Sequence, residues 1–256
     1  MAFVELNNIV CGDCLTVMDN IEKSSIDLVV TSPPYNVDNY NRGGYDIYND
    51  NLDHSKYITF LEDVFKKTYK LLKIGGRVVI NIGDGKNGGI PTSSDIIQFM
   101  VHKLNYLPMT HIIWDKSQTI NRCAWGSWKS PSSPSFPTPF EHILVFSKMD
   151  KKLQYKGKTD LTRDEFINWS LALWKFAPEK QQKKIGHPAM FPEELSRRCI
   201  KLFSYINATV LDPFVGAGTT AVSAKNLKRN FIGIDISEKY CAITNKRLGI
   251  IGGIKT

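Results

Sequence analysis

The sequence predicts a doubly wound α/β protein with a mostly parallel sheet and one small inserted lobe. Short apolar runs of strand length alternate with longer segments whose apolar residues recur at helical spacing. A glycine-containing turn between a predicted strand and a predicted helix, late in the chain, is typical of such sheets. With 256 residues, 42% of them hydrophobic, the chain can build one sizeable core. We therefore expect a single domain over residues 1–256.

The first half of the chain contains four predicted strands and two predicted helices. The continuous apolar run of residues 26–30 is typical of a strand that is buried on both faces. An apolar stripe at helical spacing over residues 53–72 predicts a helix, which we expect Gly75 and Gly76 to end. The other elements expected here are strands at 77–82, 109–114 and 141–147 and a helix at 94–105.

The second half repeats the alternation, with helices expected at 192–205, 219–228 and 238–248 and strands at 209–211 and 230–234. Residues 38–51 and 117–139 interrupt the pattern and predict long loops, which in compact domains are usually functional or mobile. Residues 149–186 combine many lysines with Phe166, Trp169, Trp174 and Phe176. They form either a solvated helical lobe or a nucleic-acid contact surface with interleaved basic and aromatic side chains.

Charge and hydropathy limit the classes of binding partner and the location that we expect for this protein. Lys and Arg number 33 against 25 Asp and Glu, which gives a formal net charge of +8. This surplus favours a polyanionic partner such as nucleic acid, although a merely basic protein would show it too. The sequence has no apolar run of membrane-spanning length and no signal-peptide pattern at its start. We therefore expect no membrane association and a cytoplasmic location.

Five cysteines are present, two of them as Cys11-Gly-Asp-Cys14. No second pair follows at zinc-ribbon spacing, so we expect reduced, mostly buried thiols and no metal site.

A Pro-Pro loop follows the strand at 26–30. It reads Ser32-Pro33-Pro34-Tyr35. Two prolines end a strand abruptly and stiffen the segment that follows. The loop is therefore either a plain strand stop or a rigid device that presents a hydroxyl and an aromatic ring to a flat ligand.

A glycine loop follows the strand at 209–211. It reads Phe214-Val215-Gly216-Ala217-Gly218 and leads into a predicted helix, and the next strand ends in Asp235. Glycines here let the backbone approach a ligand, and a carboxylate at that spacing can meet ribose hydroxyls. The third glycine of a dinucleotide fingerprint and the lysine of a P-loop are both missing. The expected ligand is thus a nucleoside without a pyrophosphate, the alternative being an ordinary tight turn.

These two loops and three further motifs resemble the DNA amino-methyltransferases that use S-adenosylmethionine. That family has an (Asp/Asn/Ser)-Pro-Pro-(Tyr/Phe) loop and a Phe-x-Gly-x-Gly loop. The further motifs are Gly12-Asp13, Pro139-Phe140-Glu141-His142 and His187-Pro188-Ala189-Met190-Phe191-Pro192. The Pro-Pro loop comes first, which is the family's beta arrangement. The resemblance covers most of the chain. It implies a Rossmann-like methyltransferase sheet with a catalytic region at 1–148, a target-recognition lobe at 149–186 and a cofactor-binding region at 187–256.

The resemblance also implies roles for individual residues. Ser32 Oγ and the Pro33 carbonyl, held rigid by Pro34, would accept hydrogen bonds from an exocyclic amine while Tyr35 stacks on the base. No covalent intermediate is expected. Asp13 is expected to contact the base or the cofactor, with a plain helix cap as the alternative. His187 is expected to be structural and to line the cofactor site. The remaining expected cofactor contacts are Asp212, Pro213, Phe214, Gly216, Gly218, Thr219, Thr220 and Asp235, and the expected nucleic-acid contacts are Lys175, Lys183 and Lys184, which could also be merely solvated.

The expected substrate is DNA, as a duplex with base flipping or as a single strand. Ser32 stands where Asp accompanies most adenine-N6 enzymes of the family, and Ser is common in cytosine-N4 enzymes. The segments around this loop look more like the adenine group, so adenine N6 is preferred and cytosine N4 is the alternative. RNA or protein methylation and a non-catalytic nucleic-acid-binding module stay open. A cognate restriction endonuclease and a homodimer are further expectations from the family.

Overall fold

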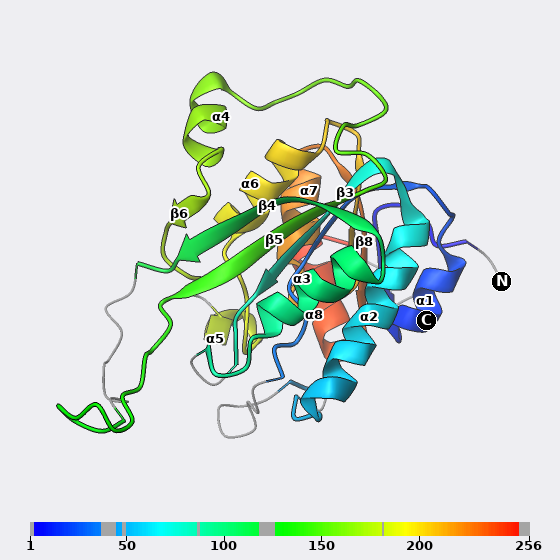
Figure 1. Cartoon of the computed structure of the whole chain (residues 1–256). Coiled ribbons are helices and arrows are strands. Elements are labelled where there is room, and N and C mark those ends of the chain that lie inside the picture. The colour runs from blue at the N-terminus through cyan, green and yellow to red at the C-terminus, as the bar shows by residue number, and fades with distance from the viewer. Residues whose placement is uncertain are drawn as a thin grey trace.

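The structure, a computed structural model, describes residues 3–36, 45–47, 50–85, 88–117, 126–180 and 182–250, with the backbone alone at Lys183. An eight-stranded sheet runs through the molecule in the order β1-β8-β7-β2-β3-β5-β4-β6 (Figure 1). Its strands are β1 (Asn8–Cys11), β2 (Ile26–Thr31), β3 (Leu72–Ile82), β4 (Tyr106–Asp115), β5 (Phe140–Lys148), β6 (Leu173–Lys175), β7 (Thr209–Asp212) and β8 (Asn230–Asp235).

The sheet is mostly parallel, as the sequence predicts. Only β5 runs against its neighbours: it pairs antiparallel with both β3 and β4, whereas the other strand pairs that the structure describes are parallel. The carboxyl ends of β2, β3 and β7 and the start of β5 consequently meet at one edge of the sheet. An open α/β sheet binds its ligands at such an edge.

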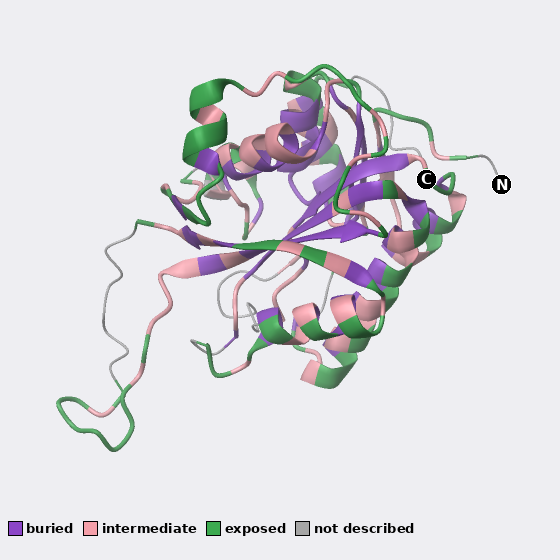
Figure 2. Cartoon of the chain, turned by 45° about the horizontal axis from the view of Figure 1, so that its top comes forward, coloured by how far each residue is buried: buried purple, intermediate pink, exposed green. Residues whose placement is uncertain are grey.

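Helices cover both faces of the sheet and form a doubly wound, three-layer molecule (Figures 1 and 2). The apolar residues of α1, α2 and α3 pack with those of β2 and β3 in one core cluster. Apolar residues of α6, α7 and α8 pack on the opposite face in a second cluster. The helices are α1 (Cys14–Val17), η1 (Met18–Asn20), α2 (His54–Leu71), α3 (Thr92–His102), α4 (Arg163–Trp169), α5 (Gln182–Ile185), α6 (Glu193–Phe203), α7 (Thr219–Asn226) and α8 (Glu238–Leu248).

One prediction about α2 is wrong. Gly75 and Gly76 do not end the helix, which stops at Leu71; both glycines lie inside β3. No glycine is needed at the helix end because Leu72 already has extended backbone angles. Gly75 instead makes room for a neighbour, since a Cβ there would lie 2.2 Å from the carbonyl oxygen of Lys152.

The segment 149–186 is only partly a lobe. Its short strand β6 joins the central sheet beside β4, so this part of the segment belongs to the main layer. The helix α4 stands away from the sheet, at the top of Figure 1. Local patterning did not predict β6 because three residues are too few to show a period.

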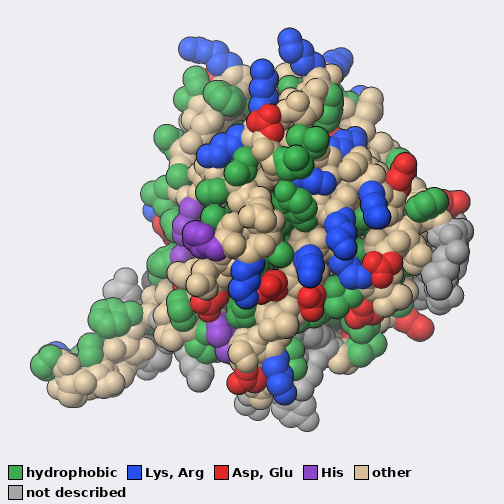
Figure 3. Space-filling model, turned by 45° about the vertical axis from the view of Figure 1, so that its right-hand side comes forward, with side chains coloured by type: hydrophobic (Ala, Val, Ile, Leu, Met, Phe, Trp, Pro, Cys, Tyr) green, Lys and Arg blue, Asp and Glu red, His purple; other side chains and the backbone are tan. Residues whose placement is uncertain are grey.

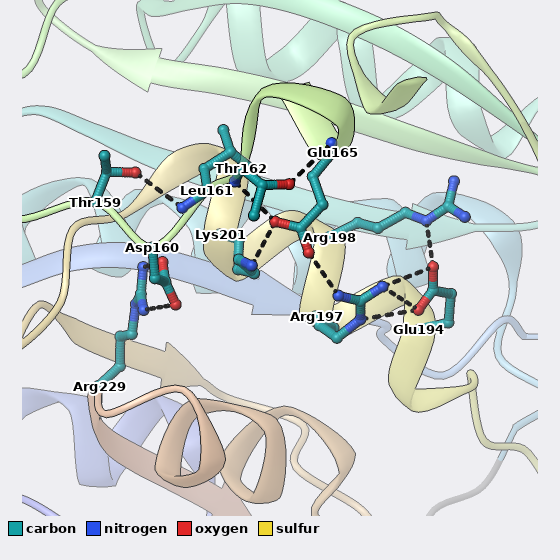
Figure 4. A network of polar contacts seen from close by, with 10 residues as sticks. All are labelled: Thr159, Asp160, Leu161, Thr162, Glu165, Glu194, Arg197, Arg198, Lys201 and Arg229. Carbon is teal, nitrogen blue, oxygen red and sulfur yellow. Dashed lines mark hydrogen bonds and ion pairs between the residues drawn. The ribbon is translucent and has the colours of Figure 1, made fainter. Parts of the chain in front are cut away.

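Ion pairs fasten α4 to α6 (Figure 4). Glu165 of α4 lies 2.9 Å from Arg197 and 2.5 Å from Lys201, both on α6. The Arg197 guanidinium also lies 4.6 Å from the ring centroid of Trp169. Just before α4, Asp160 forms a two-pronged ion pair with the buried Arg229 at 2.7 and 2.9 Å. Residues 160–169 are therefore fixed to the body by charge-assisted contacts.

Residues 126–139, which precede β5, extend away from the body as an arm at the lower left of Figure 1. A bridge between Gly126 and Pro134 closes the described part of this arm. Trp128 and Phe136 are 63% and 72% exposed on it. Trp125 and Cys123 lie outside the described residues, as does most of the expected loop at 38–51.

Candidate functional site

The Pro-Pro loop and the glycine loop lie side by side. Each follows the carboxyl end of its strand, and those strands, β2 and β7, are direct neighbours with Val29 opposite Leu211. Both loops line one cavity of about 400 Å³. The cavity wall includes Asp13, Ser32, Pro34, Tyr35, His187, Pro213, Phe214, Gly216, Thr219 and Asp235. Tertiary structure thus brings together residues that are separated by most of the chain.

The glycine loop requires both of its glycines. Gly216 and Gly218 have φ angles of +51° and +83°, in the left-handed region that side chains disfavour. A Cβ at residue 216 would lie 2.8 Å from Nε2 of His187, and one at residue 218 would lie 2.4 Å from Cγ2 of Thr244. The backbone of the loop therefore packs directly against His187 and Thr244, with no room for a side chain at either glycine.

Asp235 supports this loop from the end of β8. Its carboxylate accepts hydrogen bonds from the backbone N–H of Gly216 and of Ser237, each at 2.9 Å. Burial raises the pKa of Asp235 above its usual value, and the two N–H donors partly offset that rise. Each carboxylate oxygen has two lone pairs, so acceptor capacity remains at the cavity wall for a ligand hydroxyl.

Asp212, Gly218, Thr220 and Pro33 are not among the residues that line the cavity. Asp212 is 2% exposed and lies beneath the loops, where its Oδ1 accepts from Thr31 Oγ1 at 2.7 Å and from the Phe214 N–H at 3.0 Å. Burial raises the pKa of Asp212 to about 6. Thr220 donates to the carbonyl of Val30 at 3.2 Å. These contacts join β2 to the glycine loop. The side chains of Asp212 and Thr220 therefore hold the Pro-Pro loop and the glycine loop in fixed positions relative to each other.

His187 is buried and packs between Gly216 and Tyr240, whose ring centroid lies 4.4 Å away. Its Nδ1 accepts from the Ala189 N–H at 3.2 Å. Burial lowers the pKa of His187 to about 4, so the imidazole is neutral near pH 7 and carries its proton on Nε2. The uncharged ring of His187 therefore forms part of the cavity wall.

Asp13 caps a helix and also lies at the cavity wall. It is the N-cap of α1, with its side chain accepting from Thr16 N–H at 3.0 Å. It also lines the cavity next to Gly12 and Cys14. Capping uses one lone pair of one oxygen, and the carboxylate keeps further acceptors for a ligand.

Ser32 and Tyr35 are tied together at the end of β2. Ser32 Oγ lies 3.1 Å from both the Tyr35 hydroxyl and the Asn81 carbonyl oxygen, and donates its single proton to one of them. Its lone pairs are left to accept from a ligand. Tyr35 packs its ring beside Gly83, where a Cβ would lie 3.2 Å from Cε2. Burial and the charge of Glu141 raise the pKa of Tyr35 well above its usual value, so the phenol stays protonated.

Three further side chains line the cavity that motif reasoning gave no role. Glu141, at the start of β5, accepts from the Tyr35 hydroxyl at 2.9 Å and from Asn81 Nδ2 at 2.7 Å. Lys116 forms an ion pair with the other carboxylate oxygen of Glu141. Glu141 belongs to a segment that the resemblance singled out, but nothing in the local pattern pointed to Asn81 or Lys116.

The three lysines expected at nucleic acid do not line this cavity. Lys175 on β6 and Lys184 on α5 are exposed, and the side chain of Lys183 lies outside the described residues. Cys14, Cys199 and Cys241 are buried and Cys11 is half-buried, all as free thiols. Burial raises the pKa of Cys14 to about 12, so it is no nucleophile near pH 7.

Within the described residues, no group of three or more His, Cys, Asp or Glu side chains is arranged to hold a metal ion. No helix in this part of the chain is long and apolar enough to cross a membrane.

The chain matches a protein family described as DNA methylase (N6_N4_Mtase) over residues 26–246. It is 32% identical to the type II methyltransferase M.MjaI of Methanocaldococcus jannaschii, over 95% of this chain and 91% of that protein. It is 31% identical to the orphan methyltransferase M.BamHII of Bacillus amyloliquefaciens, over 90% of this chain and 91% of that protein. Protein TTHA0409 of Thermus thermophilus, described as a DNA modification methylase and solved with S-adenosyl-L-methionine, superposes with a TM-score of 0.74 at 26% identity, covering 94% of this chain and 93% of that one.

Proposed function

The chain belongs to the N6/N4 family of DNA methylases, and we propose that it methylates the exocyclic amine of a base in DNA, adenine N6 by preference. Family membership confirms the resemblance drawn from the motifs. One observation carries the proposal: the Pro-Pro loop and the glycine loop line the same cavity. Methyl donor and acceptor held in one cavity react as neighbours, and positioning of this kind lowers the barrier substantially.

S-adenosyl-L-methionine is the cofactor, and when bound it supplies a methyl group activated by a sulfonium. The residues present fit it. Gly216 lines the cavity with backbone alone, and Asp235 offers carboxylate oxygens for ribose hydroxyls. Phe214 and the neutral ring of His187 give apolar walls for the adenosine. No phosphate-binding group is needed, since this nucleoside has no pyrophosphate.

The protein's part in the reaction is to align and polarise the amine. The lone pair of an exocyclic amine is delocalised into the base, which makes it a poor nucleophile. Acceptors directed at its N–H groups favour the pyramidal form, in which the nitrogen lone pair would be available to accept a methyl group. Ser32 Oγ would provide one acceptor at the cavity wall, and the Tyr35 ring would stack on the base. The Pro33 carbonyl, expected as the second acceptor, belongs to a buried residue that does not line the cavity. The amine then loses one proton, which leaves with solvent.

The more specific part of the proposal is which base is methylated, adenine or cytosine. Residues around the Pro-Pro loop look more like those of adenine enzymes, whereas a neutral Ser32 is a weaker acceptor than the Asp of most of them. Cytosine N4 is therefore the second candidate. Methylation of RNA or protein amides is less favoured because the net charge of +8 suits a polyanion and the family is one of DNA methylases.

Two surfaces are proposed to contact DNA. Lys and Arg side chains are spread over the face seen in Figure 3, among acidic and hydrophobic ones, and would attract the phosphate backbone. The arm at 126–139 ends beside the cavity, because Glu141 lines the cavity and follows it closely in the chain, and the arm carries exposed Trp128 and Phe136. Such rings can stack on unpaired bases or enter a base step. The segment 149–186, with Lys175, Lys183 and Lys184, is proposed to read the recognition sequence.

A restriction partner and a homodimer are proposals drawn from relatives. M.MjaI is a type II methyltransferase, whereas M.BamHII is an orphan, so relatives of both kinds exist. Cytoplasmic location follows as a proposal from the same function.

Product analysis tests the function. The purified protein is incubated with unmethylated plasmid and labelled S-adenosyl-L-methionine, as duplex and as heat-denatured DNA, and the digested nucleosides are identified by mass spectrometry. N6-methyladenine is the expected product. N4-methylcytosine would transfer the assignment to the second candidate. Cofactor binding without label in either DNA would overturn the proposed substrate.

A further inference from the structure

A positive charge, that of Lys116, lies at the wall of the cavity. Among the described residues that line the cavity there is no other Lys or Arg, whereas three carboxylates are present, those of Asp13, Glu141 and Asp235. A nucleotide that places its base in this cavity also brings a negatively charged backbone phosphate close to the cavity. The carboxylates repel such a phosphate, so Lys116 is the cavity residue whose charge suits it.

Lys116 can reach a group that arrives at the edge of the cavity. It directly follows β4, and its backbone N–H donates to the carbonyl of Pro139, where the arm ends, at 3.0 Å. Its side chain is 26% exposed, against 12% for that of its ion-pair partner Glu141. Its ammonium lies 5.7 Å from the ring centroid of Trp114, which also lines the cavity. The backbone is therefore fixed, while the flexible side chain and its three N–H donors stay within reach of solvent.

The contact between Lys116 and Glu141 can be exchanged for another one. Lys116 pairs with Oε1 of Glu141, whereas Oε2 accepts from the Tyr35 hydroxyl at 2.9 Å and from Asn81 Nδ2 at 2.7 Å. If Lys116 moves to another anion, Glu141 keeps both of these donors. Removing the last partner of a nearly buried carboxylate is strongly destabilising, and that situation does not arise here.

We propose that Lys116 binds the backbone phosphate of the target nucleotide, and that it exchanges its contact with Glu141 for this phosphate when the base enters the cavity. The inference rests on the proposed function and adds a substrate-contacting residue to it. Ser32 and Tyr35 meet the base, while Lys116 holds the backbone from which the base projects. A phosphate contact positions the nucleotide and carries no sequence information, so Lys116 serves whichever base is methylated.

Lys116→Gln tests the charge, because a glutamine amide can still donate to Glu141. The methylated site of the plasmid is first located by sequencing, and methyl transfer from labelled cofactor is then measured on a short duplex that contains it. Loss of one charge-assisted hydrogen bond should lower kcat/KM by about tenfold or more, with the cofactor Kd within about twofold. Lys116→Arg keeps the charge and should retain most of the activity.

Lys103→Gln is the matched control. Lys103 is also paired with a glutamate, Glu62, at 2.7 Å, but it does not line the cavity. Its replacement should leave kcat/KM unchanged.

Neutral backbone linkages distinguish a phosphate contact from a structural role of Lys116. Duplexes are compared that carry a single methylphosphonate on one side or the other of the target nucleotide. One of these linkages should lower the wild-type kcat/KM by about tenfold. The Lys116→Gln protein should be nearly insensitive to that same linkage, because the contact that it would remove is already absent. Lys103→Gln should respond as the wild type does.

A wild-type protein that tolerates both neutral linkages would overturn the inference. So would a Lys116→Gln protein that loses as much activity on each modified duplex as the wild type does. Both results leave the proposed function in place, because DNA is still methylated. If Lys116→Gln does not fold, the wild-type comparison decides. A wild-type protein that labels no DNA would instead overturn the proposed function, and this inference with it.

Discussion

His187 packs against Gly216 so closely that its Nε2 lies 2.8 Å from where a Cβ of residue 216 would be. The two residues belong to different motifs, and their contact shapes the cavity wall. His187 is neutral because burial lowers its pKa to about 4. A neutral ring pressed against the glycine loop keeps this wall apolar near pH 7.

Gly216→Ala should therefore weaken the cofactor site. The added methyl group would displace His187, and alanine would be strained at a φ of +51°. We expect cofactor Kd to rise by about tenfold or more, since strain of about 1–3 kcal/mol is typical of such positions. Calorimetric titration measures it. Gly249→Ala is the matched control, because φ is +67° there but no atom of the described residues lies within 4 Å of the added Cβ. Equal affinities in the two variants would contradict this account.

Tyr35→Ala should reduce turnover and leave cofactor binding nearly intact. Its ring is proposed to stack on the base, and base–aromatic stacking is worth about 1–3 kcal/mol. Tyr35→Phe keeps the ring but removes the hydroxyl that donates to Glu141. Steady-state kinetics should place the phenylalanine variant between wild type and Tyr35→Ala. A large loss of cofactor affinity in either variant would move Tyr35 to the cofactor side of the cavity.

Removing both exposed rings of the arm, with Trp128→Ala and Phe136→Ala together, should weaken binding to DNA by about tenfold or more. Cofactor affinity should not change, because neither ring lines the cavity. Fluorescence anisotropy with labelled oligonucleotides measures the binding. Phe3→Ala removes a comparably exposed ring, 70% exposed, that lies outside both the arm and residues 149–186, and this variant should bind DNA normally. Unchanged binding in the double variant would exclude the arm from the interface.

Asp212→Asn should change how stability depends on pH. The pKa of Asp212 is raised from 3.8 to about 6 by burial. Between these values the folded chain holds more proton at this site than the unfolded chain. The contribution of Asp212 is therefore fully present below the unfolded pKa of 3.8 and is lost as pH rises through about 6.

Urea unfolding of both proteins at about pH 7 and about pH 4.5 measures this effect. Relative to Asp212→Asn, the wild type should gain stability on acidification, by on the order of 2 kcal/mol. Asparagine Oδ1 can still accept from Thr31 and Phe214, so the bonds beneath the loops are kept. A stability difference that is the same at both pH values would show that Asp212 ionises normally in the folded state.

The sequence by itself determined the fold class and the two loops that define the site. Continuous apolar runs such as 26–30 identify buried parallel strands, because both faces of such a strand are covered. Gly216 and Gly218 were recognisable because a left-handed backbone needs glycine whatever surrounds it. The prediction that Gly75 and Gly76 end a helix was wrong for a related reason. A glycine indicates unusual or crowded backbone, but it does not indicate whether that backbone belongs to a helix or to a strand.

Tertiary structure alone decided which side chains face one another across the cavity. Tyr35 and Glu141 are 106 residues apart, and they meet because β5 returns antiparallel beside β3 and brings its first residues to the carboxyl edge. The same pairing places Asn81 between them and leaves its Oδ1 without a partner among the described residues. Periodicity records which face of an element is buried. It holds no information on which strand lies next to it, because that choice depends on packing the whole chain around one core.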